Sequence, residues 1–377
     1  MFYVLLSFLF SPLISLGIIL RKKREIKNIL VIQTAKIGDM VCTTPIFREL
    51  KRHFPNSSIT VLTNPVSREV VRLNPRVDNI ITFEAKDYKG LLGKFRIIKE
   101  LRKMRFDLSL CLNPNVPLTF ITLWALIPQR IGILPDSAGS TYKLISRFNT
   151  ANTKHSLNQS ISKTYLALLE PLGIRDDGEE KEIFFSEEAS AFARDFLQKN
   201  GINSRDFLVG IAIASGNKLK EWGADRFAEL ADRLVEDRKA KIVLLGAIFD
   251  KETSIIIESK MKNSPIDACG VFSLMDLPAF IQRLSLIIGA VSGPLHIADA
   301  LGIPLVVIAG PSNMQELTFR KDYEIVQKDL PCLPCDSFFS TSYFCKEFRK
   351  ECLESIRVEE VLEAVKRLRT KVVHVSS

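Results

Sequence analysis

Residues 284–312 read LSLIIGAVSGPLHIADALGIPLVVIAGPS, a succession of strand, tight turn, helix, turn and strand. Leu286 to Ile288 is an uninterrupted apolar run, which is typical of a parallel-sheet strand that is buried on both faces. Gly302 ends the helix, and the apolar run that begins at Leu305 forms the next buried strand. The stretch therefore predicts a βαβ unit of a parallel sheet.

The turn that opens this helix has the residues of an anion site. Ser292 is a favourable N-cap, Gly293 lets a ligand approach the backbone, and Pro294 suits the first helical turn. Such a turn presents backbone N–H groups and the positive end of the helix dipole to a phosphate. His296 lies in the same turn, where it either joins a ligand site or packs in the interior. Taken alone, the stretch predicts a phosphate or nucleotide site, although many glycine-rich turns in α/β proteins bind no ligand.

The alternation of strands and helices continues through the rest of the chain and predicts parallel sheets with crossover helices. The acidic stretch Gly173 to Glu182 predicts an exposed linker between two halves, and its Asp176 and Asp177 fit a solvated charge run better than a metal site. We expect a loop-rich segment from Gly132 to about Ser156. The strands that we predict cover 28–33, 58–63, 78–83 and 106–112 in the first half, and 207–213 and 242–245 in the second.

The expected division of the chain follows from this pattern. We expect 1–24 to be a membrane anchor with a basic flank, 25–182 an N-terminal Rossmann-like domain, 183–356 a C-terminal Rossmann-like domain that contains a cysteine cluster, and 357–377 a closing helix and tail.

The N-terminus predicts a membrane segment. Residues 1–20, MFYVLLSFLFSPLISLGIIL, carry no charged side chain, and Arg-Lys-Lys-Arg follows at 21–24. A continuous helix of ~30 Å would be long enough to cross a bilayer core. Pro12 offers an alternative, a kinked anchor that lies in one leaflet. Because the basic cluster is expected to stay in the cytoplasm, we expect residues 1–20 to anchor the protein at the cytoplasmic face of the inner membrane.

Two further readings of the N-terminus are less favoured. A removed signal peptide lacks its usual basic start and small-residue cleavage motif here. A buried packing helix leaves the basic cluster at 21–24 less well explained.

The net charge of the chain indicates which classes of binding partner it favours. A formal net charge of +9 and a pI near 9.1 favour anionic partners such as nucleic acid, phosphorylated sugars or an acidic membrane face. We find no basic patch interleaved with stacking aromatics, so nucleic acid is the least favoured of the three and we expect none as a partner.

A carboxylate follows the first strand of the soluble part. Asp39 lies in the turn that leads from the strand at 28–33 into a helix, where the helix dipole favours its ionised form. The carboxyl edge of a first strand is where a doubly wound sheet presents catalytic groups. The simpler alternative is that Asp39 caps the helix.

Four of the seven cysteines crowd the region before the last helix: Cys332, Cys335, Cys345 and Cys352. These four cysteines either bind a structural zinc ion or remain free thiols, and an iron–sulfur cluster is a further alternative.

Several motifs together resemble glycosyltransferase family 9, the ADP-heptose:lipopolysaccharide heptosyltransferases and their relatives. The resemblance rests on the residues of five places, in this order: Ile37-Gly38-Asp39 with Thr43-Thr44-Pro45, Lys220-Glu221-Trp222, Gly270 to Leu277, Ser292 to His296, and Gly310-Pro311. It covers roughly Ile26 to Leu368. It implies a GT-B architecture, in which the first Rossmann-like domain binds the acceptor, the second binds a nucleotide-sugar, and no catalytic metal is needed.

The resemblance also implies roles for individual residues. Asp39 matches the catalytic base, while Lys220 and the backbone around Ser292 and Gly293 would stabilise the departing diphosphate. His296 matches the family's motif histidine, which would hold this turn or help to bind phosphate. Asp250 lies near the position of an acidic ribose contact, for which Glu252 competes.

One position departs from the family pattern. The family usually has Asp before the Ser/Thr-Gly pair, where it contacts the donor sugar, and this chain has Val291, which forms no side-chain hydrogen bond.

From the resemblance as a whole we expect an inverting, metal-independent transfer of a sugar, by default heptose from ADP-heptose, to a lipid-linked saccharide such as lipopolysaccharide core. The alternatives are a different nucleotide-sugar or a GT-B-like binding protein that has lost catalysis. A nucleotide-sugar epimerase is disfavoured by the membrane segment.

Overall fold

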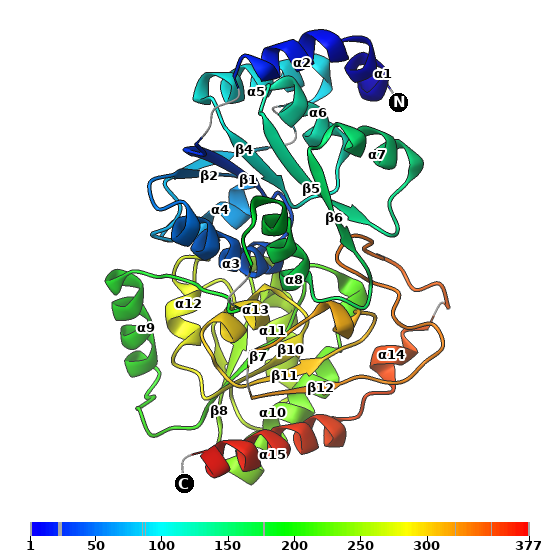
Figure 1. Ribbon diagram of the computed structural model, residues 1–377. Coiled ribbons are helices and arrows are strands. Elements are labelled where there is room, and N and C mark those ends of the chain that lie inside the picture. Colours follow the sequence, from blue (N-terminus) through cyan, green and yellow to red (C-terminus); the bar gives the residue numbers. More distant parts are fainter. Residues whose placement is uncertain are drawn as a thin grey trace. The chain divides into compact units, whose positions relative to one another are not determined.

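The computed structural model describes residues 2–21, 25–84, 86, 88–175, 178–320, 322–347 and 349–375. The chain divides into two compact units, Met1–Lys181 (unit 1) and Glu182–Ser377 (unit 2). Each unit is an α/β layer structure around its own sheet (Figure 1). The predicted α/β class is confirmed, and the division falls one residue before the boundary that the acidic stretch indicated.

Unit 1 contains a six-stranded sheet in the order β3-β2-β1-β4-β5-β6, and every neighbouring pair is parallel. Its strands are β1 (Asn28–Ile32), β2 (Ser58–Thr63), β3 (Asn79–Thr82), β4 (Leu108–Cys111), β5 (Gln129–Pro135) and β6 (Ala151–His155). Its helices are α1 (Phe2–Leu9), α2 (Ser11–Ile19), α3 (Ile37–His53), α4 (Pro65–Val71), α5 (Gly90–Met104), α6 (Val116–Trp124), α7 (Ser140–Ile145) and α8 (Ile161–Leu166), with 3-10 helices η1 (Ser146–Phe148) and η2 (Ala167–Leu172).

The helices of unit 1 form two layers. Helix α3 contacts α4 and α8 on one face of the sheet, whereas α6 contacts α5, α7 and α1 on the other (Figure 1). Strands β1 and β4 lie between these layers, and their apolar side chains are buried. This double cover explains why both strands are almost continuously apolar in sequence.

Unit 2 repeats the arrangement with the strand order β12-β11-β10-β7-β8-β9, again parallel throughout. Its strands are β7 (Leu208–Ala212), β8 (Lys241–Leu245), β9 (Ile266–Asp267), β10 (Leu286–Ala290), β11 (Leu305–Ile308) and β12 (Tyr323–Val326). Its helices are α9 (Glu187–Lys199), α10 (Ala224–Arg238), α11 (Lys251–Lys260), α12 (Leu277–Ile281), α13 (Gly293–Ala300), α14 (Glu351–Glu354) and α15 (Val358–Val375), with 3-10 helices η3 (Lys218–Lys220), η4 (Ile248–Asp250) and η5 (Met314–Glu316).

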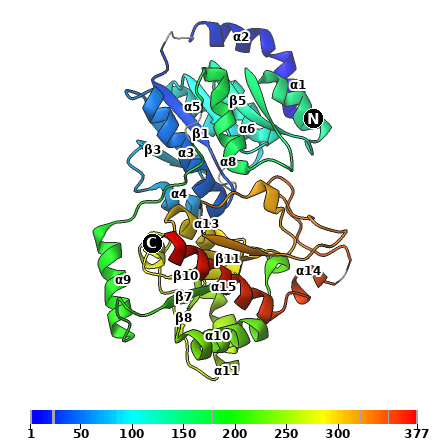
Figure 2. The ribbon, with the colours of Figure 1, turned by 60° about the horizontal axis from the view of Figure 1, so that its bottom comes forward.

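The closing helix α15 belongs to the core of unit 2. It packs on α10 and on strands β11 and β12 (Figure 2). Its buried residues Val361, Leu362 and Val365 lie on one stripe and join the cluster that surrounds the central strands. The βαβ unit that residues 284–312 predicted is present as β10, α13 and β11.

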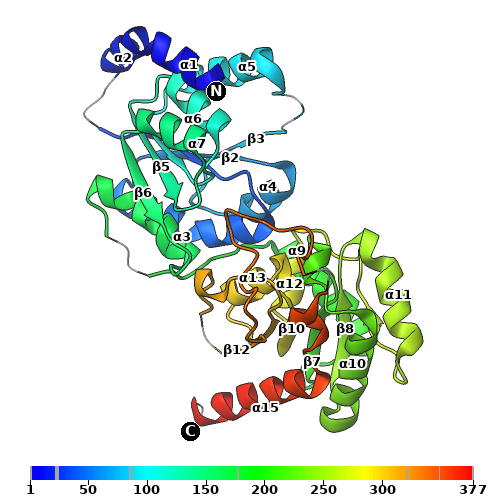
Figure 3. The same ribbon diagram turned by 90° about the vertical axis from the view of Figure 1, so that its right-hand side faces the viewer.

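The N-terminal segment differs from a continuous helix. Helices α1 and α2 are separated at Phe10 and bent by 63° (Figure 3). Pro12 has no N–H to donate to the Phe8 carbonyl, and the Ser11 hydroxyl donates to that carbonyl instead, at 2.9 Å. The break therefore has the cause that Pro12 suggested.

Among the described residues, no one helix combines the length and apolarity of a membrane span, although α1 and α2 taken together meet both conditions. The basic residues Lys22, Lys23 and Arg24 lie outside the described residues, as do Asp176 and Asp177 of the acidic stretch.

The segment after Gly132 is more ordered than predicted. It contains the end of β5, helix α7 and strand β6 rather than a loop. Strand β6 reads ANTKH and forms an edge of the sheet, with exposed and half-buried positions alternating. Edge strands carry polar residues because they are not covered on all sides, so the apolar signal that identified the central strands is missing here.

The approach of β10 to β7 gives a stability prediction. Gly289 pairs with Ala212, and a Cβ at position 289 would lie 2.8 Å from the Ala212 Cβ and 2.9 Å from its carbonyl oxygen. We expect Gly289→Ala to lower the free energy of unfolding by about 1–3 kcal/mol, because neither strand can move aside. Gly216→Ala is the control, since a Cβ there meets nothing within 4 Å. Equal urea midpoints for the two variants would contradict this packing constraint.

Candidate functional site

The strand order of unit 1 reverses direction between β1 and β4. The chain adds β2 and β3 on one side of β1 and then adds β4, β5 and β6 on the other side. The helices that follow β1 and β4 therefore lie on opposite faces of the sheet and leave an opening at the carboxyl ends of β1 and β4. The turn after β1 leads to Asp39, and the turn after β4 carries Asn113. This place is the switch point at which doubly wound sheets bind ligands.

Asp39 lies in the first turn of α3. Its Oδ2 accepts a hydrogen bond from the Lys36 backbone N–H at 3.2 Å, so the capping interaction that sequence offered as the simpler alternative is present. The residue is half-buried. A carboxylate held in this position is available to a ligand at the edge of the sheet and is favoured in its ionised form by the helix dipole.

A buried polar network lies beneath Asp39, and the sequence analysis missed it. The Gln33 amide nitrogen donates to the Tyr165 hydroxyl at 3.1 Å and to the Thr43 hydroxyl at 3.2 Å. The Asn113 amide nitrogen donates to the Gln33 Oε1 at 2.9 Å. Gln33, a polar residue at the end of an apolar strand, was the one feature of the sequence that pointed to this network.

Tyr165 is a member of this network that interacts directly with the Asp39 side chain. Burial raises the pKa of Tyr165 well above its usual value, and the charge of Asp39 raises it further. The phenol therefore stays protonated and keeps its hydroxyl hydrogen next to the carboxylate.

In unit 2 the order reverses between β7 and β10, which brings together the turns after these two strands. The turn after β7 includes η3 with Lys220, and the turn after β10 includes Val291, Ser292 and Gly293. Sequence reasoning selected both turns. The strand order is what makes them neighbours.

Ser292 does not cap α13 with its side chain. Its backbone is extended, as an N-cap requires, but its hydroxyl forms no capping hydrogen bond. The Oγ atom is buried and has no hydrogen-bond partner among the described residues. A buried hydroxyl that is left without a partner is unfavourable, so a ligand oxygen at this turn would gain by bonding to it.

His296 packs in the interior of unit 2. Only 4% of the residue is exposed, and its ring lies 6.3 Å from the Phe319 ring, centroid to centroid. This packing supports a role in holding the turn of α13 in place.

Lys220 forms a buried ion pair with Asp336. The lysine Nζ lies 2.7 Å from Asp336 Oδ2, and the two side chains are 14% and 6% exposed. Asp336 was not selected from the sequence, because it follows Cys335 in an irregular stretch that is distant from Lys220 along the chain.

Backbone hydrogen bonds hold Asp336 beside Lys220. Its N–H donates to the Pro311 carbonyl at 3.0 Å, and its own carbonyl accepts from the Asn313 N–H at 2.9 Å. The Asn217 side chain donates to the Ser342 carbonyl at 2.7 Å, which attaches the same segment to the turn after β7. The turns after β7 and β11 are therefore joined by the loop that carries Asp336.

Trp222 anchors the end of the lysine turn. It is fully buried, and its indole N–H donates to the Ile356 carbonyl at 3.1 Å. Its ring meets Phe227 edge to face at 5.1 Å. This anchor restricts the position of Lys220, two residues earlier.

Asp250 caps the 3-10 helix η4 that follows β8. Its Oδ2 accepts from the Ala247 N–H at 2.7 Å. The adjacent Ile248 and Phe249 are exposed, which is unusual for large apolar side chains and is consistent with a surface that contacts a ligand.

The four cysteines of the predicted zinc site lie near one another. Burial raises the pKa of Cys352 to about 11, and the charges of Cys335, Cys332 and Cys345 add to the increase. All four thiols are free. Four thiols are a suitable donor set for zinc or iron, but no three metal-ligating side chains in the described part of the chain are arranged to hold an ion. Zinc at this cluster stays a prediction, which elemental analysis of the purified chain would test.

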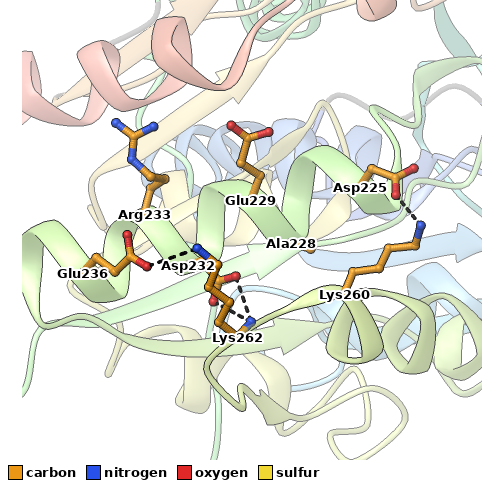
Figure 4. Close-up of a pocket in the computed structure, with 8 residues that line it drawn as sticks. All are labelled: Asp225, Ala228, Glu229, Asp232, Arg233, Glu236, Lys260 and Lys262. Atoms are coloured by element: carbon orange, nitrogen blue, oxygen red, sulfur yellow. Dashed lines mark hydrogen bonds and ion pairs between the residues drawn. The ribbon is translucent and has the colours of Figure 1, made fainter.

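A surface cavity of about 300 Å³ lies elsewhere in unit 2, between α10 and the end of α11 with the residues just after it (Figure 4). Four of its charged side chains form ion pairs, Lys262 with Glu236 at 3.8 Å and Lys260 with Asp225. Asp232 accepts the backbone N–H of Lys262 at 2.9 Å. None of the residues selected from the sequence lines this cavity, so we assign it no part in the site.

The buried ion pair generates a prediction about stability. Lys220→Met or Asp336→Leu leaves one buried charge without its partner, and each is expected to lower the free energy of unfolding by about 3–5 kcal/mol. The double variant should recover most of this loss, because neither charge remains. Urea unfolding of the four proteins measures the coupling. Lys260→Met, which breaks an exposed pair, is the control and should change stability little. If Lys220→Met proves as mild as this control, the pair is not formed.

Comparisons with known proteins agree with this geometry. The model of the family described as glycosyltransferase family 9 (heptosyltransferase) matches residues 94–341. The chain is 24% identical over 291 residues to lipopolysaccharide heptosyltransferase 3 of Escherichia coli strain K12, which covers 73% of this chain and 80% of the relative.

Two solved structures share the fold. A glycosyl transferase family 9 structure from Veillonella parvula DSM 2008 has a TM-score of 0.78 at 25% identity and covers 93% of this chain and 99% of its own. The ADP-heptose lipopolysaccharide heptosyltransferase II of E. coli has a TM-score of 0.70 at 20% identity, with 91% and 99% covered. The two sheets therefore correspond to a GT-B heptosyltransferase architecture. Because the family match extends over most of the chain, the protein belongs to glycosyltransferase family 9 and is a glycosyltransferase.

Proposed function

We propose that the protein transfers a heptosyl group from ADP-heptose to the saccharide of a lipopolysaccharide core. The observation that carries the proposal is the family match across residues 94–341. The names of the relatives support the substrates, because one is a lipopolysaccharide heptosyltransferase and another an ADP-heptose lipopolysaccharide heptosyltransferase. In this proposal unit 1 binds the lipid-linked saccharide and unit 2 binds the nucleotide-sugar.

Asp39 acts as the general base in this proposal. An inverting transfer needs a group that accepts the proton of the acceptor hydroxyl while the bond between sugar and phosphate breaks. The position of Asp39 at the switch point of unit 1 supports this role, as does its half-buried carboxylate in the first turn of α3. The protonated Tyr165 beside it offers a hydrogen bond that helps to orient the carboxylate.

The departing diphosphate is stabilised by unit 2 without a catalytic metal. Lys220 supplies a positive charge, and the turn of Ser292 and Gly293 supplies backbone N–H groups and a buried hydroxyl. Pro294 and His296 hold this turn. Asp250 contacts the ribose from the turn after β8, where the exposed Ile248 and Phe249 cover the base.

Asp336 takes the place of the carboxylate that is missing at position 291. Val291 cannot bond to a sugar hydroxyl. Asp336 lies 2.7 Å from Lys220 in the turn after β7, and its backbone bonds to the turn after β11. We place the carboxylate contact to the donor sugar on this residue. The competing proposal, a binding protein without turnover, is favoured by Val291 alone.

The donor proposal is tested with a panel of nucleotides and nucleotide-sugars. We expect ADP and ADP-heptose to raise the melting temperature of the purified chain more than uridine or guanosine counterparts, because a ligand that binds only the folded state stabilises it. We also expect ADP release when a lipopolysaccharide core acceptor is added. Transfer from another nucleotide-sugar would replace the donor. Binding of ADP-heptose with no transfer to any core acceptor would favour the binding protein.

Asp39→Asn tests the base. The amide keeps an oxygen that can accept the Lys36 N–H, but it cannot accept a proton from the acceptor, so we expect kcat to fall about 10²–10⁴-fold with little change in ADP affinity. Asp78→Asn is the matched control in unit 1, because Asp78 also accepts a backbone N–H, from Ile59 at 2.7 Å, but precedes β3 at the opposite edge of the sheet. Full transfer by Asp39→Asn would remove Asp39 from the mechanism.

A further inference from the structure

The helix pair α1 and α2 presents a row of apolar side chains to solvent. Two of them, Leu9 and Leu20, are 72% and 78% exposed. The full set, which we call the N-terminal apolar face, is Phe2, Leu5, Leu9, Leu13, Leu16, Ile19 and Leu20. So many large apolar side chains on two short helices are unusual on a water-exposed surface and indicate an interaction site.

The opposite side of the same helices is docked on unit 1. Val4, Ser7 and Ile14 are buried, and the Trp124 indole N–H donates to the Ser7 hydroxyl at 3.2 Å. The Phe10 ring lies 5.6 Å from the Trp124 ring. The two helices therefore lie along the surface of unit 1 (Figure 3), and the side chains of their apolar face are exposed.

Helix α5 is strongly basic, and its end lies near the end of α2. Arg21, at the end of α2, donates to the Arg102 carbonyl at 3.4 Å, and Phe95 packs on the same Trp124 as Phe10, with ring centroids 5.7 Å apart. Helix α5 carries five basic residues and one acidic residue. Of these, Arg96, Lys99 and Lys103 are exposed. In sequence, the basic cluster at 21–24 lies directly after the apolar face.

We propose that the N-terminal apolar face inserts in the plane of an anionic phospholipid membrane, in its cytoplasmic leaflet, with Arg21 and the exposed basic residues of α5 at the headgroups. Charge complementarity selects this occupant, because an uncharged apolar strip beside exposed lysine and arginine matches acyl chains beside anionic headgroups. The 63° bend and the docked inner side keep both helices parallel to the surface. This inference rests on the geometry of unit 1 and does not depend on the donor or on Asp39.

Flotation of the full chain with lipid vesicles tests the proposal. We expect binding to phosphatidylcholine vesicles that contain phosphatidylglycerol to exceed binding to phosphatidylcholine alone by about tenfold or more, and to weaken as salt is raised. The variant Leu9→Glu/Leu13→Glu/Leu16→Glu should lose at least about tenfold in binding, since three side chains that would enter the acyl region become charged.

A matched variant separates the face from general hydrophobicity. Val66→Glu/Leu157→Glu/Ile255→Glu changes three exposed apolar residues outside the face and should float like the native chain. Circular dichroism confirms that both triple variants are folded. Equal flotation of the two triple variants, or equal binding to neutral and anionic vesicles, would overturn the proposal.

The orientation is tested in sealed inverted inner-membrane vesicles. A protease added outside should remove an N-terminal tag as readily as it cleaves the rest of the chain, because an in-plane anchor leaves both on one side. A protected tag would show a spanning segment and overturn the in-plane arrangement. Sugar transfer to a water-soluble core saccharide should be unchanged in the Leu9→Glu/Leu13→Glu/Leu16→Glu variant, so that loss of membrane binding and failure of the proposed activity are told apart.

Discussion

The strict parallelism of both sheets is the constraint on which the other features of the protein depend. Parallel strands are joined by crossover helices that cover both faces of the sheet. The carboxyl ends of all strands in a sheet therefore lie at the same edge, and the helices leave this edge open where the direction of the strand order reverses. These openings lie at β1/β4 in unit 1 and at β7/β10 in unit 2. Asp39 lies at the first, and Lys220 with the Ser292 turn lies at the second.

Each opening is completed by polar groups that come from distant parts of the chain. Gln33, Asn113 and Tyr165 support the base turn through buried hydrogen bonds. In unit 2, Asp336 pairs with Lys220 in a place with little access to water. A buried charge without a partner is strongly unfavourable, so the loop that carries Asp336 and the lysine turn hold each other in position. The proposed catalytic groups are in this way fixed before any substrate binds.

The N-terminal helices follow a different rule from the sheets. Their outward residues have no partner in the described chain that would bury them, while their inward residues pack on Trp124 and its neighbours. Pro12 breaks the helix, and the break lets the two parts follow the surface of unit 1. The apolar residues of this segment are thus divided between the protein interior and an outer surface that suits lipid.

By itself the sequence determined the α/β class, the central strands, the glycine-serine turn after β10, the helix start at Asp39 and the family, because apolar runs, turn residues and motif order are local properties of the chain. It did not identify β6 or Tyr165, since an edge strand and an isolated tyrosine carry no periodic signal. Only the tertiary structure decided that Asp336 reaches Lys220, that the Ser292 hydroxyl is buried without a cap, and that α1 and α2 bend along unit 1. Each of these depends on contacts between residues that are far apart in the chain or on burial, and neither can be read from local spacing.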